Sequence, residues 1–301
     1  MKGLVYKSTG SWYSVRSETG DMYDCKIKGK LRLNNINSTN PVVVGDIVEF
    51  VVEEHDLQEI GIIQKIHDRR NYILRKSVNL SKQTHILASN IDILLLVITI
   101  KNPITTTSFI DRFLVSAEAY SVKTILVFNK CDIHDINDEI LLNLFINTYK
   151  RIGYDTIKTS TFSEIGIKEL KKKISGKTIM LGGHSGVGKT SLINSIDTSL
   201  NLKVGNISDQ HFQGKHTTTY AELHDLNNGS KLIDTPGIKG FGLVDFDRQE
   251  IKDFFPEFVK LKSKCKFNNC MHLNEPKCYI KQKIQTDEIS KSRYDSYIQI
   301  I

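Results

Sequence analysis

Residues 183–190 read G-H-S-G-V-G-K-T, and this spacing of glycine, lysine and threonine suits the binding of phosphate groups. Glycines allow backbone N–H groups to turn toward phosphate oxygens with no Cβ in the way. Lys189 supplies a positive charge to the outer phosphates, and the Thr190 hydroxyl suits Mg²⁺. We therefore expect a site for a nucleoside polyphosphate with Mg²⁺. The residues expected to contact the nucleotide here are Gly183, His184, Ser185, Gly186, Val187, Gly188, Lys189, Thr190 and Ser191.

A loop of this kind needs a strand before it and a helix after it, and the flanking sequence predicts both. Residues 178–181 form a short apolar run, and residues 191–196 have the composition of a helix. The amino end of that helix would point its free N–H groups and the positive end of its dipole at the same phosphates. The order of strand, loop and helix distinguishes the segment from a chance glycine-rich turn.

A second polar segment, N-K-C-D at residues 129–132, follows the run K-T-I-L-V-F at residues 123–128, which ends in four apolar residues. The apolar run predicts a buried parallel strand, so the polar residues would lie at its carboxyl end. An Asp132 carboxylate can accept hydrogen bonds from the ring N–H and the exocyclic amine of guanine, a pattern that adenine lacks. Alone the segment suits a polar turn equally well, but beside the phosphate loop it predicts guanine and disfavours an ATPase. The expected guanine-binding residues are Asn129, Lys130, Cys131 and Asp132.

A third segment, residues 231–237, predicts a strand that ends in D-x-x-G. We expect the Thr190 hydroxyl to contact Mg²⁺ directly, Asp234 to reach it through a water molecule, and the Gly237 N–H to contact the terminal phosphate. Residues 215–219, K-H-T-T-T, offer further hydroxyls in a loop that could order around the metal. The sequence leaves open which of these threonines would bind Mg²⁺.

The order of the three segments is unusual. Ordinary GTPases carry the phosphate loop first, D-x-x-G second and N-K-x-D third, whereas here N-K-x-D comes first. A doubly wound sheet tolerates this rearrangement when its original ends lie close together. On these motifs the chain resembles the circularly permuted GTPases, and among them the RsgA (YjeQ) family. The resemblance covers nearly the whole chain, and it implies that Ser160 and Thr161 belong to the third guanine-contacting segment.

The resemblance also implies in-line attack of water on the terminal phosphate of GTP, giving GDP. Ordinary small GTPases place a glutamine after D-x-x-G to orient the water, whereas this chain has Ile238 and the family likewise carries an apolar residue. His216 is the candidate for this role because the family's switch segment carries a histidine before its threonines; an exposed loop histidine is equally open. Lys189 and Thr218 are the other expected catalytic residues. His184 departs from the glutamine or asparagine more common in the family.

Three thiols and one imidazole fall within residues 265–278 in the spacing C-x4-C-x-H-x5-C. Such a set completes a tetrahedron and leaves no position for water, which describes one structural Zn²⁺ rather than a catalytic one. The segment has little apolar material, so we expect its folding to need the metal. The RsgA family has a zinc segment of the same spacing. The expected ligands are Cys265, Cys270, His272 and Cys278.

The elements around these motifs predict a multidomain chain. Residues 1–76 would form an OB-type β-barrel from short runs separated by turn residues. Residues 77–245, in which strands and helices alternate, would form the circularly permuted α/β P-loop GTPase domain, with a mostly parallel sheet covered on both faces. Residues 246–301 would form a small helical zinc-binding domain. The barrel strands are expected at residues 4–6, 12–16, 22–27, 42–44, 47–52 and 61–66.

Charge is concentrated on the flanks of the chain. The net charge is +7; residues 1–76 carry 12 basic and 10 acidic side chains, and residues 251–301 carry 10 and 6. An excess of this kind suggests a polyanionic partner. OB-type barrels bind oligonucleotides, which favours RNA as the partner. The sequence leaves open the alternative that this barrel serves only for packing or protein contact. The aromatic side chains that could either stack on bases or belong to the barrel core are Trp12, Tyr13 and Tyr23.

The resemblance implies a GTPase that acts in late maturation of the small (30S) ribosomal subunit, with that subunit and its rRNA as partners. Since we identify no arginine finger, we expect the ribosome to stimulate hydrolysis. The alternative is an RNA-binding assembly factor that uses GTP mainly as a conformational ligand. We expect no membrane association, because the chain shows no targeting pattern and no apolar run long enough to cross a bilayer. Five cysteines that suggest metal binding rather than disulfides indicate a reducing cytoplasm. We expect a monomer, since nothing in the sequence suggests an obligate dimer.

Overall fold

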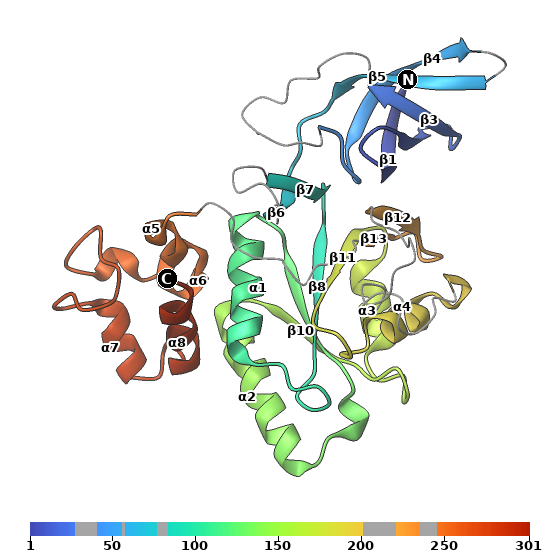
Figure 1. The fold of residues 1–301 in the computed structure, drawn as a ribbon. Helices are drawn as coiled ribbons and strands as arrows, with labels where there is room; N and C mark the ends of the chain where they lie inside the picture. Colours follow the sequence, from blue (N-terminus) through green and yellow to red (C-terminus); the bar gives the residue numbers. More distant parts are fainter. Residues whose placement is uncertain (28–40, 56–57, 77–83, 201–220, 235–245) are drawn as a thin grey trace, which may run out of the picture.

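The computed structural model describes residues 1–27, 41–55, 58–76, 84–200, 221–234 and 246–301 (Figure 1). Within these residues the chain forms an amino-terminal barrel, a central α/β domain and a small helical carboxyl-terminal domain. No helix in the described ranges is both long enough and apolar enough to span a membrane.

Five strands among the described residues close a barrel at the amino-terminal end. Their pairing order is β1-β2-β3-β5-β4, β4 pairs back with β1, and β3 runs parallel to β5. Alternate residues fill the interior, among them Val5, Val15 and Phe50. The expected OB-type barrel is confirmed. Its strands are β1 (Lys2–Ser8), β2 (Tyr13–Ser17), β3 (Met22–Ile27), β4 (Ile47–His55) and β5 (Gln58–Ile66).

The valines at residues 42–44 do not form the strand that their sequence predicts. All three are buried, but only Val44 pairs, through an isolated bridge to Ala88. Gly45 follows with a φ of +90°, and the Asp46 carboxylate accepts a hydrogen bond from the Val43 N–H at 2.9 Å. This turn bends the chain before a ladder can form, so the valines contribute to packing rather than to the sheet.

The central sheet brings the predicted motifs to one edge. Its strand order is β10-β9-β8-β11-β13-β12, and β12 alone among these strands runs antiparallel. The strand before N-K-C-D (β9) and the strand before the phosphate loop (β11) therefore flank the same strand, β8, and end at the same side. The strands are β8 (Ile93–Ile98), β9 (Thr124–Phe128), β10 (Asp155–Lys158), β11 (Thr178–Gly182), β12 (Glu222–Asp225) and β13 (Lys231–Asp234).

Helices cover both faces of this sheet, as expected for a doubly wound domain. Successive residues of β8 point to opposite faces: Leu94 and Leu96 pack with α1 and α2, whereas Leu95 and Val97 pack with α3 and α4. The wholly apolar strand is explained by burial on both sides. The helices are α1 (Thr107–Ala119), α2 (Ile136–Ile152), α3 (Ile167–Ile174) and α4 (Lys189–Ile196), with the short helices η1 (Cys131–Ile133) and η2 (Thr198–Leu200).

The barrel joins the central domain through one strand pair and a hairpin. β1 pairs with β12 at Lys7 and Glu222, so the barrel strands continue the central sheet. Arg16 on the barrel also binds Asp225 at 2.6 Å. The hairpin consists of β6 (Tyr72–Lys76) and β7 (Thr84–Ser89), and the domain boundary expected after residue 76 falls between its strands.

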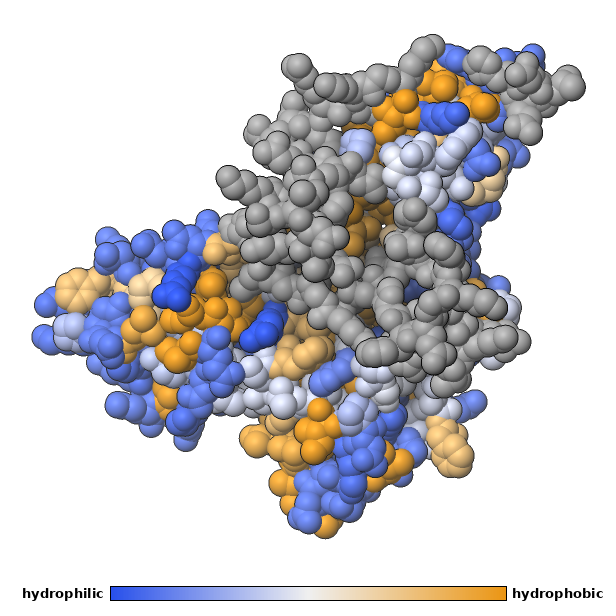
Figure 2. All heavy atoms as spheres, viewed as in Figure 1, coloured by the Kyte–Doolittle hydropathy of each residue, from blue (hydrophilic) through white to orange (hydrophobic). Residues whose placement is uncertain are grey.

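The carboxyl-terminal domain packs against α1, as Figure 1 shows. Its core contains Phe255, Phe258 and Tyr297, and α1 contributes Val115 to it. Figure 2 shows an apolar area surrounded by polar side chains on this domain, and exposed apolar residues also lie on α2, including Ile136. The elements are α5 (Arg248–Ile251), η4 (Lys252–Phe254), α6 (Pro256–Val259), η5 (Lys262–Lys264), α7 (Tyr279–Gln285) and α8 (Lys291–Ile300).

Candidate nucleotide-binding site and metal cluster

The phosphate loop lies between β11 and α4, as its sequence predicts. Gly183, Gly186 and Gly188 all have positive φ, a backbone conformation that residues other than glycine rarely adopt. Space is also limiting at Gly188, where an added Cβ would lie 2.5 Å from the Asn129 Nδ2. The shape of the loop therefore requires glycine for its conformation and for its close approach to the N-K-C-D residues 129–132, which we call the guanine segment.

Lys189 reaches back across this loop. Its Nζ donates to the carbonyl oxygens of Gly183 and His184 at 2.9 and 2.6 Å. These contacts hold the ammonium group above the loop, where it can exchange a carbonyl partner for a phosphate oxygen. Thr190 is the second residue of α4 and is nearly buried. The N–H groups of the first turn of α4 point the same way, so the loop offers both charge and amides to an anion.

One buried side chain connects the phosphate loop to the guanine segment. The Asn129 Nδ2 donates to the Val187 carbonyl at 2.9 Å, and the Asn129 Oδ1 accepts from the Thr159 hydroxyl at 3.0 Å. Asn129 is 1% exposed. Three segments that are far apart in the sequence are thus fixed to one another by one side chain.

Asp132 is exposed at this edge, and a neighbouring hydroxyl orients it. The Ser160 Oγ donates to the Asp132 carboxylate and accepts from the N–H groups of Phe162 and Ser163. Ser160 is fully buried, and Thr161 follows it, half-buried, in the loop after β10. The carboxylate keeps further lone pairs for the two N–H groups that guanine would present.

Lys130 and Cys131 complete this segment. Lys130 adopts a left-handed conformation, and its Nζ donates to the Asn102 carbonyl at 2.6 Å. The Cys131 N–H donates to the Thr159 carbonyl at 3.1 Å, and burial raises the pKa of the Cys131 thiol to about 11. Cys131 is therefore a neutral thiol that supports the turn through its backbone.

Sequence reasoning missed the segment that contains Asn102 and Pro103. It follows β8 and lies beside both motifs, because Asn102 binds Lys130 and the Pro103 ring lies 3.5 Å from where a Cβ on Gly186 would stand. A signal was present: the segment directly follows the carboxyl end of a predicted parallel strand, where such sheets place their binding loops.

The expected magnesium residues follow neighbouring strands. Asp234 ends β13, and β13 pairs with β11, whose loop leads to Thr190. Burial raises the pKa of Asp234, so the ionised carboxylate would gain from a cation beside it. A hydroxyl and a carboxylate are the oxygen donors that Mg²⁺ prefers, and the residues fit the ion. His216, Thr218 and Gly237 lie outside the described residues.

His184 turns away from the phosphate side and toward α1. Its ring stacks on Phe109, with ring centroids 4.0 Å apart and an angle of 29° between the rings. Burial, and then the charge of Lys189, lower the pKa of His184. The neutral ring leaves its Nε2 buried without a hydrogen-bond partner among the described residues. In the phosphate loop His184 thus provides a packing contact to α1.

The predicted metal ligands converge in the carboxyl-terminal domain. One ligand atom from each of the four residues lies within 4.8 Å of the others. The His272 Nδ1 is 3.4 Å from the Cys278 Sγ and 3.8 Å from the Cys265 Sγ. Tetrahedral Zn²⁺ with its usual bond lengths separates nitrogen and sulfur ligands by about 3.6 Å. The cluster of Cys265, Cys270, His272 and Cys278 can therefore hold a metal ion, and its donor set fits zinc.

Neighbouring groups fix the backbone of this cluster. Lys252 and Tyr294 donate to the carbonyl oxygens of Cys270 and His272 at 3.1 and 2.7 Å. Glu275 accepts from the N–H groups on either side of His272, those of Met271 and Leu273. Burial raises the pKa of the Cys270 thiol to about 12, so a cation is needed to favour its thiolate. Burial also lowers the pKa of the His272 imidazole to about 4.

Comparison with known protein families gives two matches that together span most of the chain. The RsgA GTPase family matches residues 66–244, which is more than half of the chain, and the RsgA N-terminal domain matches residues 2–63.

Relatives and solved structures agree with these matches. Proteins named small ribosomal subunit biogenesis GTPase RsgA from Flavobacterium psychrophilum and Christiangramia forsetii are each 54% identical; the alignments cover all of this chain and 92% and 96% of the relatives. YjeQ from Thermotoga maritima has a TM-score of 0.79 at 33% identity, covering 99% of this chain and 96% of YjeQ. YloQ, described as a circularly permuted GTPase, has a TM-score of 0.74 at 29% identity, covering 99% of this chain and 92% of YloQ.

Proposed function

The chain belongs to the RsgA GTPase family, and on that basis we propose that it acts in the late maturation of the small ribosomal subunit. Family membership confirms the expected GTPase activity and, with the strand order of the central sheet, the circularly permuted fold. The observation that carries the proposal is the edge of the sheet where Asn129 joins the guanine segment to the phosphate loop. Both ends of a GTP molecule would be bound there.

At this edge the chain's own residues would bind and orient GTP. Asp132 would accept hydrogen bonds from guanine, with Ser160 holding the carboxylate in place. Lys189 and the loop amides would neutralise the phosphates. Thr190 and Asp234 would hold Mg²⁺, which when bound adds positive charge beside the transferred phosphate. We keep His216 as the candidate that orients water, with Thr218 beside it.

The barrel offers a surface for RNA. Trp12 is 39% exposed, and the Lys26 Nζ lies 4.0 Å from the centre of its ring, so an aromatic face and a cation stand together. Such pairs suit a base and its phosphate. Tyr13 is 1% exposed and belongs to the barrel core, whereas Tyr23 is half-buried against Phe50. Trp12 is therefore our candidate for stacking on rRNA.

The remaining assignments complete the proposal. The metal of the cysteine cluster would be one structural Zn²⁺, since four protein ligands leave no position for a substrate. We propose a cytoplasmic monomer, and we retain the three-domain division at residues 1–76, 77–245 and 246–301.

The test is GTP turnover by the purified chain with and without purified small subunits. We expect slow hydrolysis alone and faster hydrolysis with subunits, because Ile238 stands where other GTPases carry a water-orienting glutamine. ATP in excess should not compete with GTP. Equal rates with and without subunits would contradict the partner-stimulated part of the proposal.

The absence of that glutamine also favours a second candidate, an RNA-binding factor for which GTP is mainly a conformational ligand. A Thr218→Ala or His216→Ala variant that still binds GTP separates the two. If hydrolysis is the function, such a variant should bind small subunits but fail to leave them. Normal release without turnover would favour the second candidate.

A further inference from the structure

Helix α1 contacts the nucleotide site at one end and the carboxyl-terminal domain along its side (Figure 1). In its first turn, the Phe109 ring stacks on His184 of the phosphate loop and lies 5.0 Å from Phe113. Phe113 in turn approaches the strand before the loop, because a Cβ on Gly182 would stand 2.7 Å from its ring. One face of α1 is therefore fitted closely to the phosphate loop and its strand.

A buried ionic network attaches the other face of α1 to the carboxyl-terminal domain. Arg293 on α8 donates from Nη1 to the Asp111 carboxylate at 2.7 Å, and from Nε and Nη2 to Glu257 at 2.7 and 3.1 Å. Tyr149 donates to the same Asp111 oxygen at 2.8 Å. Arg293 and Asp111 are both 0% exposed. Buried charges of this kind are strongly destabilising when one partner is lost, so the network fixes where α8 sits on α1.

The two faces belong to one rigid element. Phe109 and Asp111 are two residues apart, which on a helix directs their side chains to nearly opposite sides. Val115, one turn after Asp111, lies in the core of the carboxyl-terminal domain, and Ser108 donates to Gln299 of α8 at 2.6 Å. A shift of α1 relative to the phosphate loop therefore displaces the contacts that seat α8.

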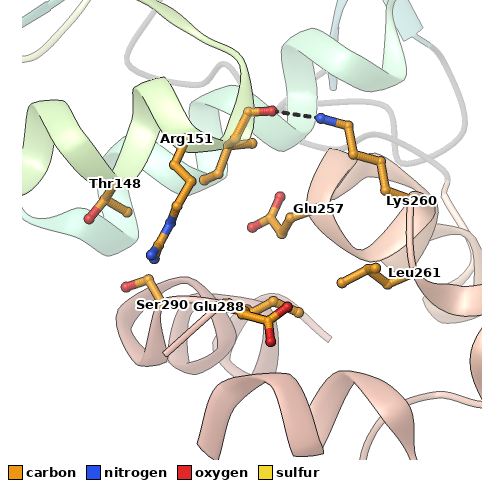
Figure 3. A pocket seen from close by; sticks show the side chains of 9 residues that line it. Thr148, Arg151, Glu257, Lys260, Leu261, Glu288 and Ser290 are labelled. Atoms are coloured by element: carbon orange, nitrogen blue, oxygen red, sulfur yellow. Dashed lines mark hydrogen bonds between the residues drawn. The ribbon is translucent and has the colours of Figure 1, made fainter. Parts of the chain in front are cut away.

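Beyond α1, the interface between these domains is hollowed. A pocket of about 160 Å³ lies between α2 and the carboxyl-terminal domain, and Lys260 donates to the Ile152 carbonyl at its edge (Figure 3). Arg151 and Glu288 face this pocket from its two sides. The empty space leaves the side chains around it without packing partners, so α2 holds the domain less firmly than α1 does.

We propose that Phe109 and Arg293 are positioning residues for nucleotide binding, which α1 couples to docking of the carboxyl-terminal domain. Phe109 acts through His184 on the phosphate loop, and Arg293 acts through Asp111 on the placement of Phe109. Because coupling is reciprocal, bound nucleotide holds α8 in its seat, and a firmly seated α8 raises nucleotide affinity by the same factor. The inference rests on the proposed binding of GTP at this loop.

The test is hydrogen exchange of the α8 amides in the full chain with its metal, with and without a non-hydrolysable GTP analogue. Coupling of the usual size would slow exchange in α8 roughly 5- to 150-fold when the analogue binds. Phe109→Ala should bind the analogue more weakly and lose this protection at saturating analogue. If Phe109→Ala fails to fold, His184→Ala replaces it, since this variant removes the other ring of the same stack. It should also bind the analogue more weakly and lose the protection of α8. Leu144→Ala is the control, since this apolar side chain is 60% exposed on α2 and lies outside the loops of the nucleotide site, and it should retain protection.

Affinity measurements supply the reverse arm. Arg293→Met should weaken binding of the analogue, while Arg293→Lys, which keeps the charge but not the forked geometry, should restore part of it. A merely structural role predicts instead equal affinity for every variant that folds. If Arg293→Met does not fold, the exchange experiment decides alone.

Each outcome has a separate meaning. If the native chain binds no guanine nucleotide, the proposed function fails. If it binds the analogue without protecting α8, or if protection survives in Phe109→Ala, the coupling through α1 is wrong. If protection survives in Phe109→Ala, any coupling would have to pass through the chain between β13 and α5, which also connects the two domains.

Discussion

At the scale of single residues, Asn129 shows how a short motif can define a site. Both polar atoms of its amide are used, one toward the phosphate loop and one toward Thr159. The side chain is buried, so neither bond competes with water. Its structural role explains why an asparagine begins this segment, while Asp132 remains at the surface, where we propose that it binds the base.

Guanine recognition should depend on the charge of Asp132. We expect Asp132→Asn to weaken GDP binding at least about 10-fold, since a hydrogen bond to a charged acceptor contributes roughly 1.5–3 kcal/mol, and the amide keeps one neutral acceptor while its NH₂ group faces a guanine N–H. Titration with a fluorescent GDP measures the change. Xanthine carries a carbonyl where guanine carries its amine, so the variant should bind xanthosine diphosphate better than the native chain does. Unchanged GDP affinity would remove Asp132 from the site.

The phosphate loop should not tolerate a side chain at Gly188. Gly188→Ala places a Cβ 2.5 Å from the Asn129 amide at a φ of +95°, and we expect it to abolish detectable nucleotide binding. Gly10→Ala on the barrel is the matched control, because its φ of +87° gives the same strain with nothing within 4 Å. That control should cost about 1–2 kcal/mol of unfolding free energy and leave nucleotide affinity intact. Isothermal titration and thermal unfolding separate the two effects.

The residues that the sequence could predict are those whose role follows from type and spacing. The glycines of the phosphate loop, Lys189 and the four clustered cysteine and histidine residues belong to this group, since their chemistry is local. Asn102 and Arg293 do not belong to it. Their roles depend on partners across the fold, one through a backbone carbonyl and the other through carboxylates on α1 and α6. An arginine in a carboxyl-terminal helix carries no signal that it will be buried.

At the scale of elements, the helix α2 begins with an N-cap residue, Asp135, that also forms an ion pair. The Asp135 carboxylate accepts from the N–H groups of Asn137 and Asp138 and binds Lys101 at 3.0 Å. The backbone hydrogen bond from Asp138, then Lys101, lower the pKa of Asp135 to about 2. The cap lies beside the N-K-C-D turn, so it fixes the helix that follows the guanine segment.

The depressed pKa predicts how this cap responds to acid. A carboxyl whose pKa is lower in the folded chain stabilises it at pH values above about 4, and the effect is lost as the pH falls toward 2. Asp135→Ala should therefore lower the unfolding midpoint at pH 7, and its deficit against the native chain should shrink below pH 4. Asp135→Asn keeps an acceptor for the cap without the charge and should lie between them. Thermal melts across this range provide the measurement, and a deficit that does not change with pH would contradict the assignment.

The cysteine loop should need its metal to keep its shape. Cys270→Ser removes one ligand, and we expect bound zinc to fall from one equivalent to near zero, with loss of helical signal from the carboxyl-terminal domain. Cys25→Ser is the control, since this thiol is equally buried but lies in the barrel. It should keep one zinc per chain. Elemental analysis and circular dichroism measure both quantities, and zinc retained by Cys270→Ser would exclude this cluster as the site.

Elements were predictable where pattern and packing agree. The apolar strands of the central sheet and the helices over it follow from burial on both sides of the sheet. The strand predicted at the valines of residues 42–44 was wrong, because the turn at Gly45 prevents the strand pairing that their composition favours. The contact between α1 and the phosphate loop was also out of reach, since stacking of His184 on Phe109 requires the strand order as well as the helix face.

At the scale of the whole molecule, the rearranged order places both flanking domains at the nucleotide-binding part of the sheet. The barrel leads into β8, the chain leaves the sheet at β13, and β11 with the phosphate loop lies between these strands. The barrel also covers the sheet edge at β12 through β1. An edge so covered is protected from pairing with other chains, and the cationic flanks are held on either side of a GTPase core.

This arrangement predicts where binding to ribosomal RNA should depend on salt. If the barrel face at Trp12 and Lys26 contacts RNA, Lys26→Gln should weaken binding to small subunits and reduce the slope of log affinity against log salt by about 1, because one fewer counterion is released. Lys123→Gln is the matched control, since this lysine is exposed on the central domain and paired with Asp155. Its slope should equal that of the native chain. Filter binding across a salt series distinguishes the cases: equal slopes for Lys26→Gln and the native chain would mean that this face does not contact phosphate.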